Sequence, residues 1–265
     1  LLKAAINRNM ADILFLTQRI PWPPIKGEKI RPGQIIRHFA KSYRVFLGTL
    51  IDDPEDEQYA SIVEGQVHEA FFGRIDRRMA YLKSLTGLLT GEPLSFKFYW
   101  DRALARWVQQ MLDRIKPEVV FVCSSNMMPY LAGARHRPRV LVVDFADVDS
   151  EKWRAYAEDS NWLNTIVYRR EWHRTRAAEI AIARDVDWVT FVTAEEKALF
   201  DQVAPGFEAK TRGLLSGVDA EFFCAGRERA QRPDNDRSKF RLHRHHGLPA
   251  KRTGGCLVCQ RDLAA

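Results

Sequence analysis

Two groups of charged residues follow apolar runs and could contact a polar ligand. The first is Lys26, Gly27, Lys29 and Arg31, in the segment after residues 13–16 (ILFL), a run typical of a buried parallel strand. Glycine lets a backbone approach a ligand closely, and the three cations could bind phosphate or an acceptor. We predict that this loop contacts substrate. The alternative is that Gly27 only makes a turn and the cations are solvated.

The second group is Asp144, Asp147, Asp149 and Ser150, at and beyond the end of the apolar run at residues 139–145 (RVLVVDF). Carboxylates at the carboxyl end of a strand could hold the hydroxyl groups of a sugar or an acceptor. The alternative is that Asp149 and Ser150 cap the helix that follows, with Ser150 as the N-cap. The sequence predicts no metal site in this part of the chain and leaves the catalytic residues unknown.

Both groups depend on the strands and helices that position them. We expect strands at residues 13–16, 43–51, 67–75, 119–123, 139–145, 187–193 and 210–215. We expect helices at residues 30–40, 77–89, 95–115, 127–134, 150–184 (with a break near 159–161) and 194–203. This alternation predicts an α/β, Rossmann-like fold: a mostly parallel sheet with helices on both faces. Ligands in such folds bind outside the carboxyl ends of the strands, where both charged groups fall.

The net charge of +7 is concentrated at one end of the chain. Residues 225–265 hold ten Lys or Arg and four Asp or Glu, whereas the other 224 residues hold 31 and 30. Because the body is nearly neutral, we expect no nucleic-acid partner for it. Four cysteines in 265 residues do not make a disulfide framework, which favours a reducing cytoplasmic compartment.

The pattern divides the chain into three parts: an N-terminal extension (1–9), an α/β domain (10–223) and a basic tail (224–265). The tail lacks helical or strand periodicity, and we expect it to be disordered or the product of out-of-frame translation. Two other interpretations stay open. The tail could bind nucleic acid or acidic lipid, or it could bind zinc through its histidines and cysteines (His243, His245, His246, Cys256 and Cys259).

Specific motifs within residues 10–223 resemble a known family. They are Arg19-Ile20-Pro21 with Pro23-Pro24-x-Lys26-Gly27-x-Lys29-Ile30-Arg31, Leu47-Gly48-Thr49 with Asp52-Asp53-Pro54-Glu55-Asp56, Asp144 with residues 147–153 (DVDSEKW), Phe191-Val192-Thr193, and Gly217-Val218-Asp219 with Phe222-Phe223. The chain resembles the N-terminal half of a GT-B-fold glycosyltransferase of the retaining family-four type. More narrowly, it is similar to sugar transferases associated with exopolysaccharide and PEP-CTERM/exosortase loci.

The resemblance implies a function in polysaccharide biosynthesis. Such enzymes transfer a sugar with retention from a nucleotide-diphosphate donor to a saccharide or lipid-linked acceptor, and the donor is a substrate, so no cofactor is implied. Contact with the inner face of the plasma membrane is also implied, and the basic, amphipathic segment at residues 77–89 is our candidate for it. This chain departs from the family pattern at Ser216, a position where family members usually have Asn. The family also continues into a second, donor-binding α/β domain, so we expect a truncated chain that is inactive alone.

Other functions are possible for an α/β domain of this kind. A non-catalytic binding or interaction module would need a partner chain to supply the missing half. A nicotinamide oxidoreductase is disfavoured because the motif G-x-G-x-x-G does not follow the first strand. A nucleic-acid binder would depend on the basic tail, and its binding would fall steeply with salt.

Overall fold

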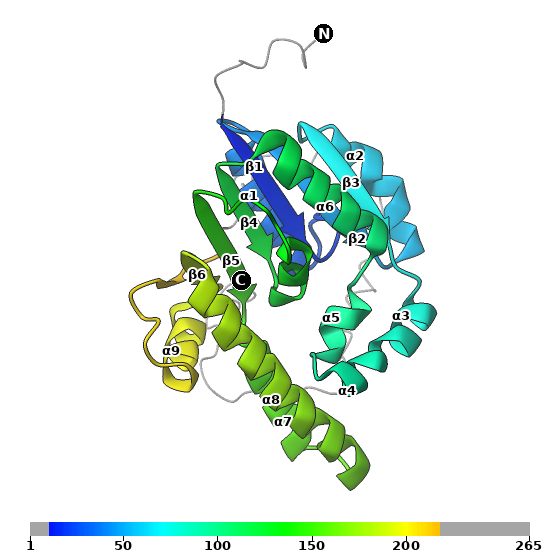
Figure 1. Cartoon of the computed structure of the whole chain (residues 1–265), viewed down its shortest axis with the longest axis vertical. Coiled ribbons are helices and arrows are strands. Elements are labelled where there is room, and N and C mark those ends of the chain that lie inside the picture. Colours follow the sequence, from blue (N-terminus) through cyan, green and yellow to red (C-terminus); the bar gives the residue numbers. More distant parts are fainter. Residues whose placement is uncertain (1–10, 218–265) are drawn as a thin grey trace, which may run out of the picture. The chain divides into compact units, whose positions relative to one another are not determined.

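The computed structural model describes residues 11–217, and within them one sheet of seven parallel strands forms the centre (Figure 1). The strands are β1 (Asp12–Thr17), β2 (Arg44–Ile51), β3 (Glu69–Arg74), β4 (Val119–Cys123), β5 (Val140–Ala146), β6 (Trp188–Phe191) and β7 (Thr211–Gly213). Their order in the sheet is β3-β2-β1-β4-β5-β6-β7. The Rossmann-like fold class predicted from the sequence is confirmed.

The helices follow the strands along the chain. They are α1 (Gly27–Phe39), the 3-10 helix η2 (Pro54–Tyr59), α2 (Ala60–Glu64), α3 (Arg77–Ser84), α4 (Thr86–Thr90), α5 (Leu94–Phe98), α6 (Arg102–Ile115), the 3-10 helix η3 (Ser125–Leu131), α7 (Asp149–Glu158), α8 (Trp162–Asp185) and α9 (Ala194–Val203). Among residues 11–217, none of these helices combines the length and apolarity that crossing a bilayer requires. The predicted tail and N-terminal extension lie outside the described residues.

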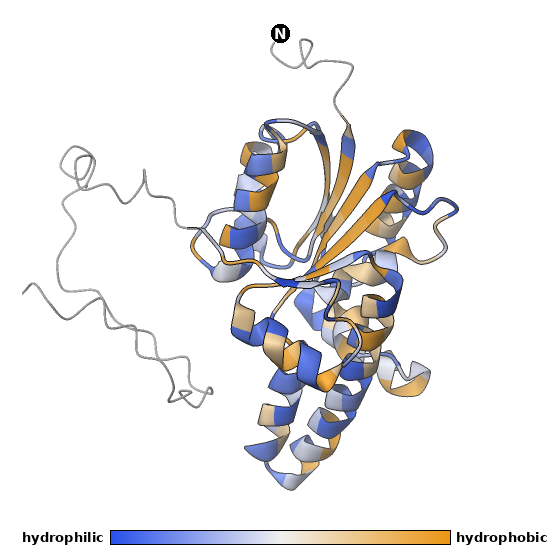
Figure 2. Ribbon diagram, turned by 90° about the vertical axis from the view of Figure 1, so that its left-hand side faces the viewer, coloured by the Kyte–Doolittle hydropathy of each residue, from blue (hydrophilic) through white to orange (hydrophobic). Residues whose placement is uncertain are grey.

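Two apolar cores lie on opposite faces of the sheet. On one face, α6, α8 and α9 pack against β1, β2, β4, β5 and β6, and Leu104, Ile182 and Phe200 are among the buried side chains. On the other face, α1 and α2 contribute Ile36 and Val63. The strands are therefore apolar on both sides, which is why they form continuous hydrophobic runs in the sequence and in the ribbon of Figure 2.

The long helix predicted at residues 95–115 is wrong, because the chain breaks between α5 and α6. Asp101 begins α6 as its N-cap, and its carboxylate accepts a hydrogen bond from the backbone N–H of Leu104 (2.6 Å). The hydroxyl of Tyr130 accepts from the N–H of Asp101 (2.7 Å) and donates to the carbonyl of Tyr99 (2.6 Å). A side chain from η3 thus satisfies backbone groups that a continuous helix would have paired internally.

Residues 77–89, predicted as one helix, form two. α3 and α4 meet at Leu85, and Gly91, in the left-handed conformation (φ 75°), is the C-cap of α4. The sequence predicts no helix after β2, where the structure has η2 and α2. Proline at the first position of η2 and the Asp53 carboxylate, which accepts from the N–H of Glu55 (3.1 Å), begin that segment.

Gly27 was expected in a loop, and it instead opens α1, with Lys26 as N-cap. No atom lies within 4 Å of the place where a Cβ on Gly27 would stand. Gly33 is different, because a Cβ there would lie 2.9 Å from the backbone oxygen of Pro21. Gly33 is therefore the residue that lets α1 pack against the chain leaving β1.

We expect Gly33→Ala to lower the free energy of unfolding by about 1–3 kcal/mol, because a backbone carbonyl must move to admit the methyl group. Gly27→Ala, in the same helix, is the matched control and should be neutral or stabilising by up to about 1 kcal/mol. Urea denaturation of both variants measures the difference. Equal stability of the two would show that the close approach of α1 to Pro21 does not constrain the fold.

Candidate functional site

A cavity of about 560 Å³ opens at the carboxyl edge of the sheet. β1 and β4 are neighbours in the sheet, but the chain leaves β1 toward β2 on one side and leaves β4 toward β5 on the other side. The gap between two such strands is a topological switch point, where doubly wound folds bind ligands. Ser95 of α5 and Tyr99, directly after it, form one wall of the cavity. The α7–α8 hairpin forms another through Trp153, Tyr156 and Thr175. In Figure 1 these helical units project on either side of the strand ends.

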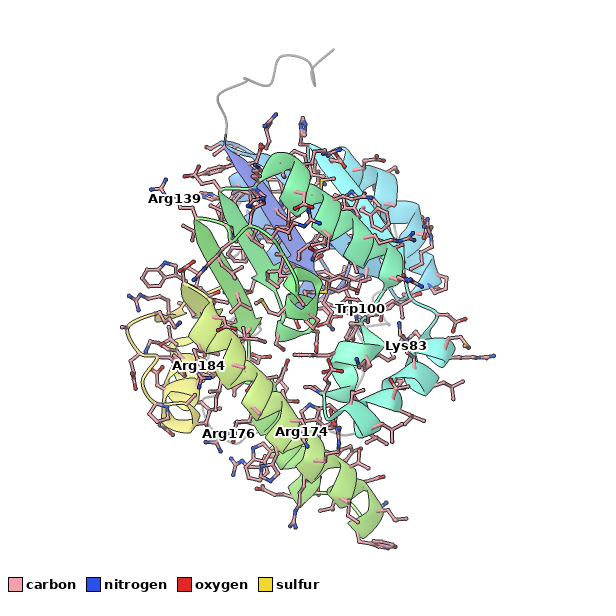
Figure 3. All side chains as sticks on the ribbon, viewed as in Figure 1. Lys83, Trp100, Arg139, Arg174, Arg176 and Arg184 are labelled. Carbon is pink, nitrogen blue, oxygen red and sulfur yellow. The ribbon has the colours of Figure 1, made fainter. Side chains whose placement is uncertain are left out.

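Figure 3 labels residues on two sides of the cavity: Lys83 and Trp100 on the side of α3 to α5, and Arg174 and Arg176 on the side of α8. Lys83 lies beside Trp100, whose backbone carbonyl accepts a hydrogen bond from its ammonium group (2.8 Å). The two sides are joined, because Glu171 on α8 accepts from the backbone N–H of Leu94 at the start of α5 (2.8 Å).

Two residues at the strand ends have a strained backbone. Ser124, directly after β4, has φ 80° and ψ 138°, and Ala146, the last residue of β5, has φ 63°. Both line the cavity, and both lie in the left-handed half of conformational space that side chains rarely adopt. Such strain persists only where the surrounding structure imposes it, and it is concentrated at functional sites.

The floor of the cavity holds a buried ion pair between Arg31 and Asp144. The guanidinium donates to both carboxylate oxygens, at 2.7 and 2.8 Å, and Thr190 donates a third hydrogen bond to the carboxylate (2.6 Å). The remaining guanidinium nitrogen donates to the carbonyl of Leu214 and to the hydroxyl of Ser216 (3.3 Å). Each of these buried charges is therefore paired and hydrogen-bonded, as burial requires.

The other cations of the cavity are also paired. Lys152 lies 2.9 Å from a carboxylate oxygen of Asp147 and 2.9 Å from one of Asp149. Burial acts to lower the pKa of Lys152, but the two carboxylates outweigh it and raise that pKa. Arg19 pairs with Glu28 and with Asp52 (3.0 Å).

The structure brings five of the predicted site residues together around the cavity. They are Gly27, Arg31, Asp144, Asp147 and Asp149.

The other three predicted site residues do not line the cavity. Lys26 is exposed at the start of α1. Lys29 points to η2, where its buried ammonium pairs with Asp56 at 2.6 and 2.7 Å. Ser150 is fully buried against α8.

Ser150 is not the N-cap of α7, because that position belongs to Val148. Its backbone N–H and its hydroxyl instead donate to the two carboxylate oxygens of Glu179 on α8, at 3.1 and 2.6 Å. Glu179 therefore caps α7 from a neighbouring helix. These bonds hold the cavity-facing first turn of α7 against α8.

The aromatic wall of the cavity is not among the site residues predicted from the sequence. Trp153 and Tyr156 share one face of α7 with Asp149 and Lys152, at the spacing i, i+3, i+4, i+7. Polar and aromatic residues at the spacing of a buried helical face were the signal that could have revealed this wall. Cys123 also lines the cavity, and burial raises the pKa of its thiol well above the usual value, so it is not a ready nucleophile.

This arrangement suits an uncharged, hydroxyl-rich ligand. Among the described residues, the lining holds three cations and four carboxylates, and each cation already has an acidic partner. Paired carboxylates keep free lone pairs that can accept hydrogen bonds from hydroxyl groups. Within residues 11–217, no three His, Cys, Asp or Glu side chains converge as ligands for a metal ion.

We expect Glu179 to make stability depend on pH. Burial raises its pKa from 4.5 to about 8, so between these values the folded protein holds a proton that the unfolded chain releases. The free energy of unfolding should therefore fall as pH rises from about 5 to 8, by about 1.4 kcal/mol per pH unit.

Glu179→Gln should remove this slope and exceed the wild type in stability at pH 8. Like the protonated acid, the amide accepts a hydrogen bond from the Ser150 N–H through its oxygen and can donate one to the Ser150 hydroxyl oxygen. Urea denaturation across this pH range measures the slope, and Glu158→Gln, at an exposed position of α7, is the control. If the slope persists in Glu179→Gln, Glu179 is not the source of the pH dependence of stability.

The comparisons with known proteins bear on the fold. No protein-family model matches the chain, and no curated protein matches its sequence. Sucrose-phosphate synthase from Thermosynechococcus elongatus has a similar structure, with a TM-score of 0.51 and 12% identity over 80% of this chain and 49% of that one. The N-terminal domain of trehalose-6-phosphate phosphatase from Candida albicans matches with a TM-score of 0.43 and 10% identity, over 82% of this chain and 51% of that one.

At 12% identity, the likeness to sucrose-phosphate synthase concerns the fold alone. This chain spans about half the length of that structure. The likeness supports the α/β, Rossmann-like fold that the sequence predicted.

Proposed function

We propose that residues 10–223 form the acceptor-binding half of a glycosyltransferase of polysaccharide biosynthesis. The observation that carries this proposal is the cavity at the switch point of a glycosyltransferase-like sheet, lined by paired carboxylates. The acceptor is a saccharide or a lipid-linked saccharide. Asp147 and Asp149 hold its hydroxyl groups near the carboxyl ends of the strands.

A second α/β half binds the nucleotide-diphosphate sugar and faces this cavity. Transfer proceeds with retention, and charge grows on the departing diphosphate, so the donor half must supply the groups that stabilise it. In this half, the cations around the cavity are paired with carboxylates, so they have little positive charge left to bind a diphosphate. The proposal therefore places the donor site outside residues 11–217.

We expect this chain to bind saccharides and not nucleotide sugars. Isothermal titration calorimetry with neutral oligosaccharides and with uridine and guanosine diphosphate sugars tests this. Asp147→Asn should weaken saccharide binding about three- to tenfold, because it removes a charged hydrogen-bond acceptor. Asp113→Asn, at an exposed position of α6, should not.

Tight donor binding by this chain, or no saccharide binding, would overturn the proposal. Transfer itself is tested by joining this chain to a donor-binding half and following the anomeric proton of the product by NMR. A chain that binds saccharide but supports no transfer in that form would be a carbohydrate-binding module.

We also propose that α3 and α4 rest on an anionic membrane surface, at the cytoplasmic face. Large apolar side chains of this segment are exposed, with Leu89 at 90% and Leu82 at 63%. The same segment carries Arg77, Arg78 and Lys83 and has no acidic residue from residue 77 to residue 90. Exposed apolar groups beside cations favour the interface of anionic lipid.

Flotation with vesicles tests this contact. The chain should float with vesicles of phosphatidylglycerol and phosphatidylethanolamine and less with phosphatidylcholine alone, because three cations attract anionic lipid. Leu89→Glu should reduce flotation about tenfold by placing a charge where an apolar group enters the interface. Ile62→Glu, at an exposed position of α2, should float as the wild type does. Equal flotation of all three would contradict the contact.

A further inference from the structure

We infer that Trp153 and Tyr156, with the hydroxyl of Thr175, form a stacking subsite that selects an uncharged pyranose unit of the acceptor. This inference rests on the proposed function, because it names the substrate class of the same cavity. It is carried by the packing of the aromatic rings, by an unpartnered buried hydroxyl and by the charge balance of the lining.

Three rings hold the aromatic wall in place. Trp153 and Tyr156 on α7 have centroids 5.9 Å apart, and both pack against Tyr168 of α8, at 5.7 and 6.0 Å. Trp153 and Tyr156 line the cavity and are half-buried, so part of each ring is open to a ligand. A ring held in place by its neighbours offers a flat apolar surface and loses little side-chain entropy on binding. Such a surface can pack against the C–H face of a pyranose.

Thr175 supplies an independent sign of a ligand. Its side chain lies on α8 and lines the cavity, yet the residue is only 3% exposed and its hydroxyl has no hydrogen-bond partner among residues 11–217. Buried hydroxyl groups are normally paired, and one left unpaired costs about 1–3 kcal/mol. A hydroxyl can both donate and accept, which matches a sugar hydroxyl.

Two other buried polar side chains of the site have partners, whereas the Nε of Arg19, which also lines the cavity, has none among the described residues. Asp144 is paired with Arg31 and Thr190, and Ser150 is paired with Glu179. Thr175 therefore differs from Asp144 and Ser150 in having a hydroxyl whose hydrogen-bonding capacity the described residues leave unused.

The charges of the cavity exclude an acidic sugar. The lining has four carboxylates (Glu28, Asp144, Asp147 and Asp149) and three cations (Arg19, Arg31 and Lys152), and every one of these cations lies in an ion pair. A uronic acid or a sugar phosphate would meet a net negative lining and would have to displace an existing partner. An uncharged sugar meets acceptors for its hydroxyl groups without that cost.

Saturation-transfer NMR on the full chain tests the subsite. The probes are the methyl glycosides of glucose, galactose and mannose, with methyl glucuronide and glucose 6-phosphate as the charged counterparts. We expect at least one neutral glycoside to bind and the charged counterparts to bind at least about tenfold more weakly, as like-charge repulsion at an interface predicts.

Two variants test the named side chains. Trp153→Leu should weaken binding up to about tenfold by removing the stacked ring. Trp162→Leu, at an exposed position of the same hairpin, should leave binding unchanged. Thr175→Val should weaken binding about three- to tenfold while leaving the melting temperature equal or higher, because it removes an unpaired buried hydroxyl at constant shape.

The outcomes separate this inference from the proposed function. If the wild type binds no saccharide, neutral or charged, the proposed function fails and the subsite fails with it. If a neutral glycoside binds but Trp153→Leu and Thr175→Val bind it as the wild type does, the subsite is wrong and the acceptor role stands. Preference for a charged sugar would overturn the assigned substrate class.

Discussion

The guanidinium of Arg31 connects three parts of the chain that the sheet alone would not hold together. It pairs with Asp144 at the end of β5, bonds to the carbonyl of Leu214 beyond β7, and is carried by α1, which follows β1. Burying two charges is costly unless geometry and further hydrogen bonds compensate. Here Thr190 and Ser216 supply those bonds, so the pair fixes the relative positions of α1, β5 and residues 214–216 around the cavity.

This pairing also limits the positive charge that the cavity can offer a ligand. A cation whose charge is met by a neighbouring carboxylate has little left to offer a phosphate, whereas the carboxylate keeps lone pairs for hydroxyl groups. The same logic applies to Lys152, which two aspartates hold. The positive φ angles of Ser124 and Ala146 turn the chain sharply at the strand ends, so polar groups from adjacent connections surround one space.

The helices around the cavity serve two purposes. The α7–α8 hairpin presents Trp153 to the ligand, while the bonds from Ser150 to Glu179 hold its two helices together. On the other side, α5 completes the cavity, and α3 and α4 expose apolar and basic side chains. A lipid-linked saccharide acceptor would need the cavity for its sugar to lie close to the side chains of α3 and α4 proposed to face the membrane.

Local patterns in the sequence determined the strands, the parallel sheet and the edge of the sheet at which the cavity opens, because apolar runs and their periodicity reflect burial residue by residue. The pairings that shape the site were decided only by the tertiary structure. Arg31 meets Asp144 across 113 residues of sequence, Lys29 turns away to Asp56, and Tyr130 breaks a helix by bonding at residues 99 and 101. Each is a contact between distant segments, and nothing in the composition of either segment reveals the other.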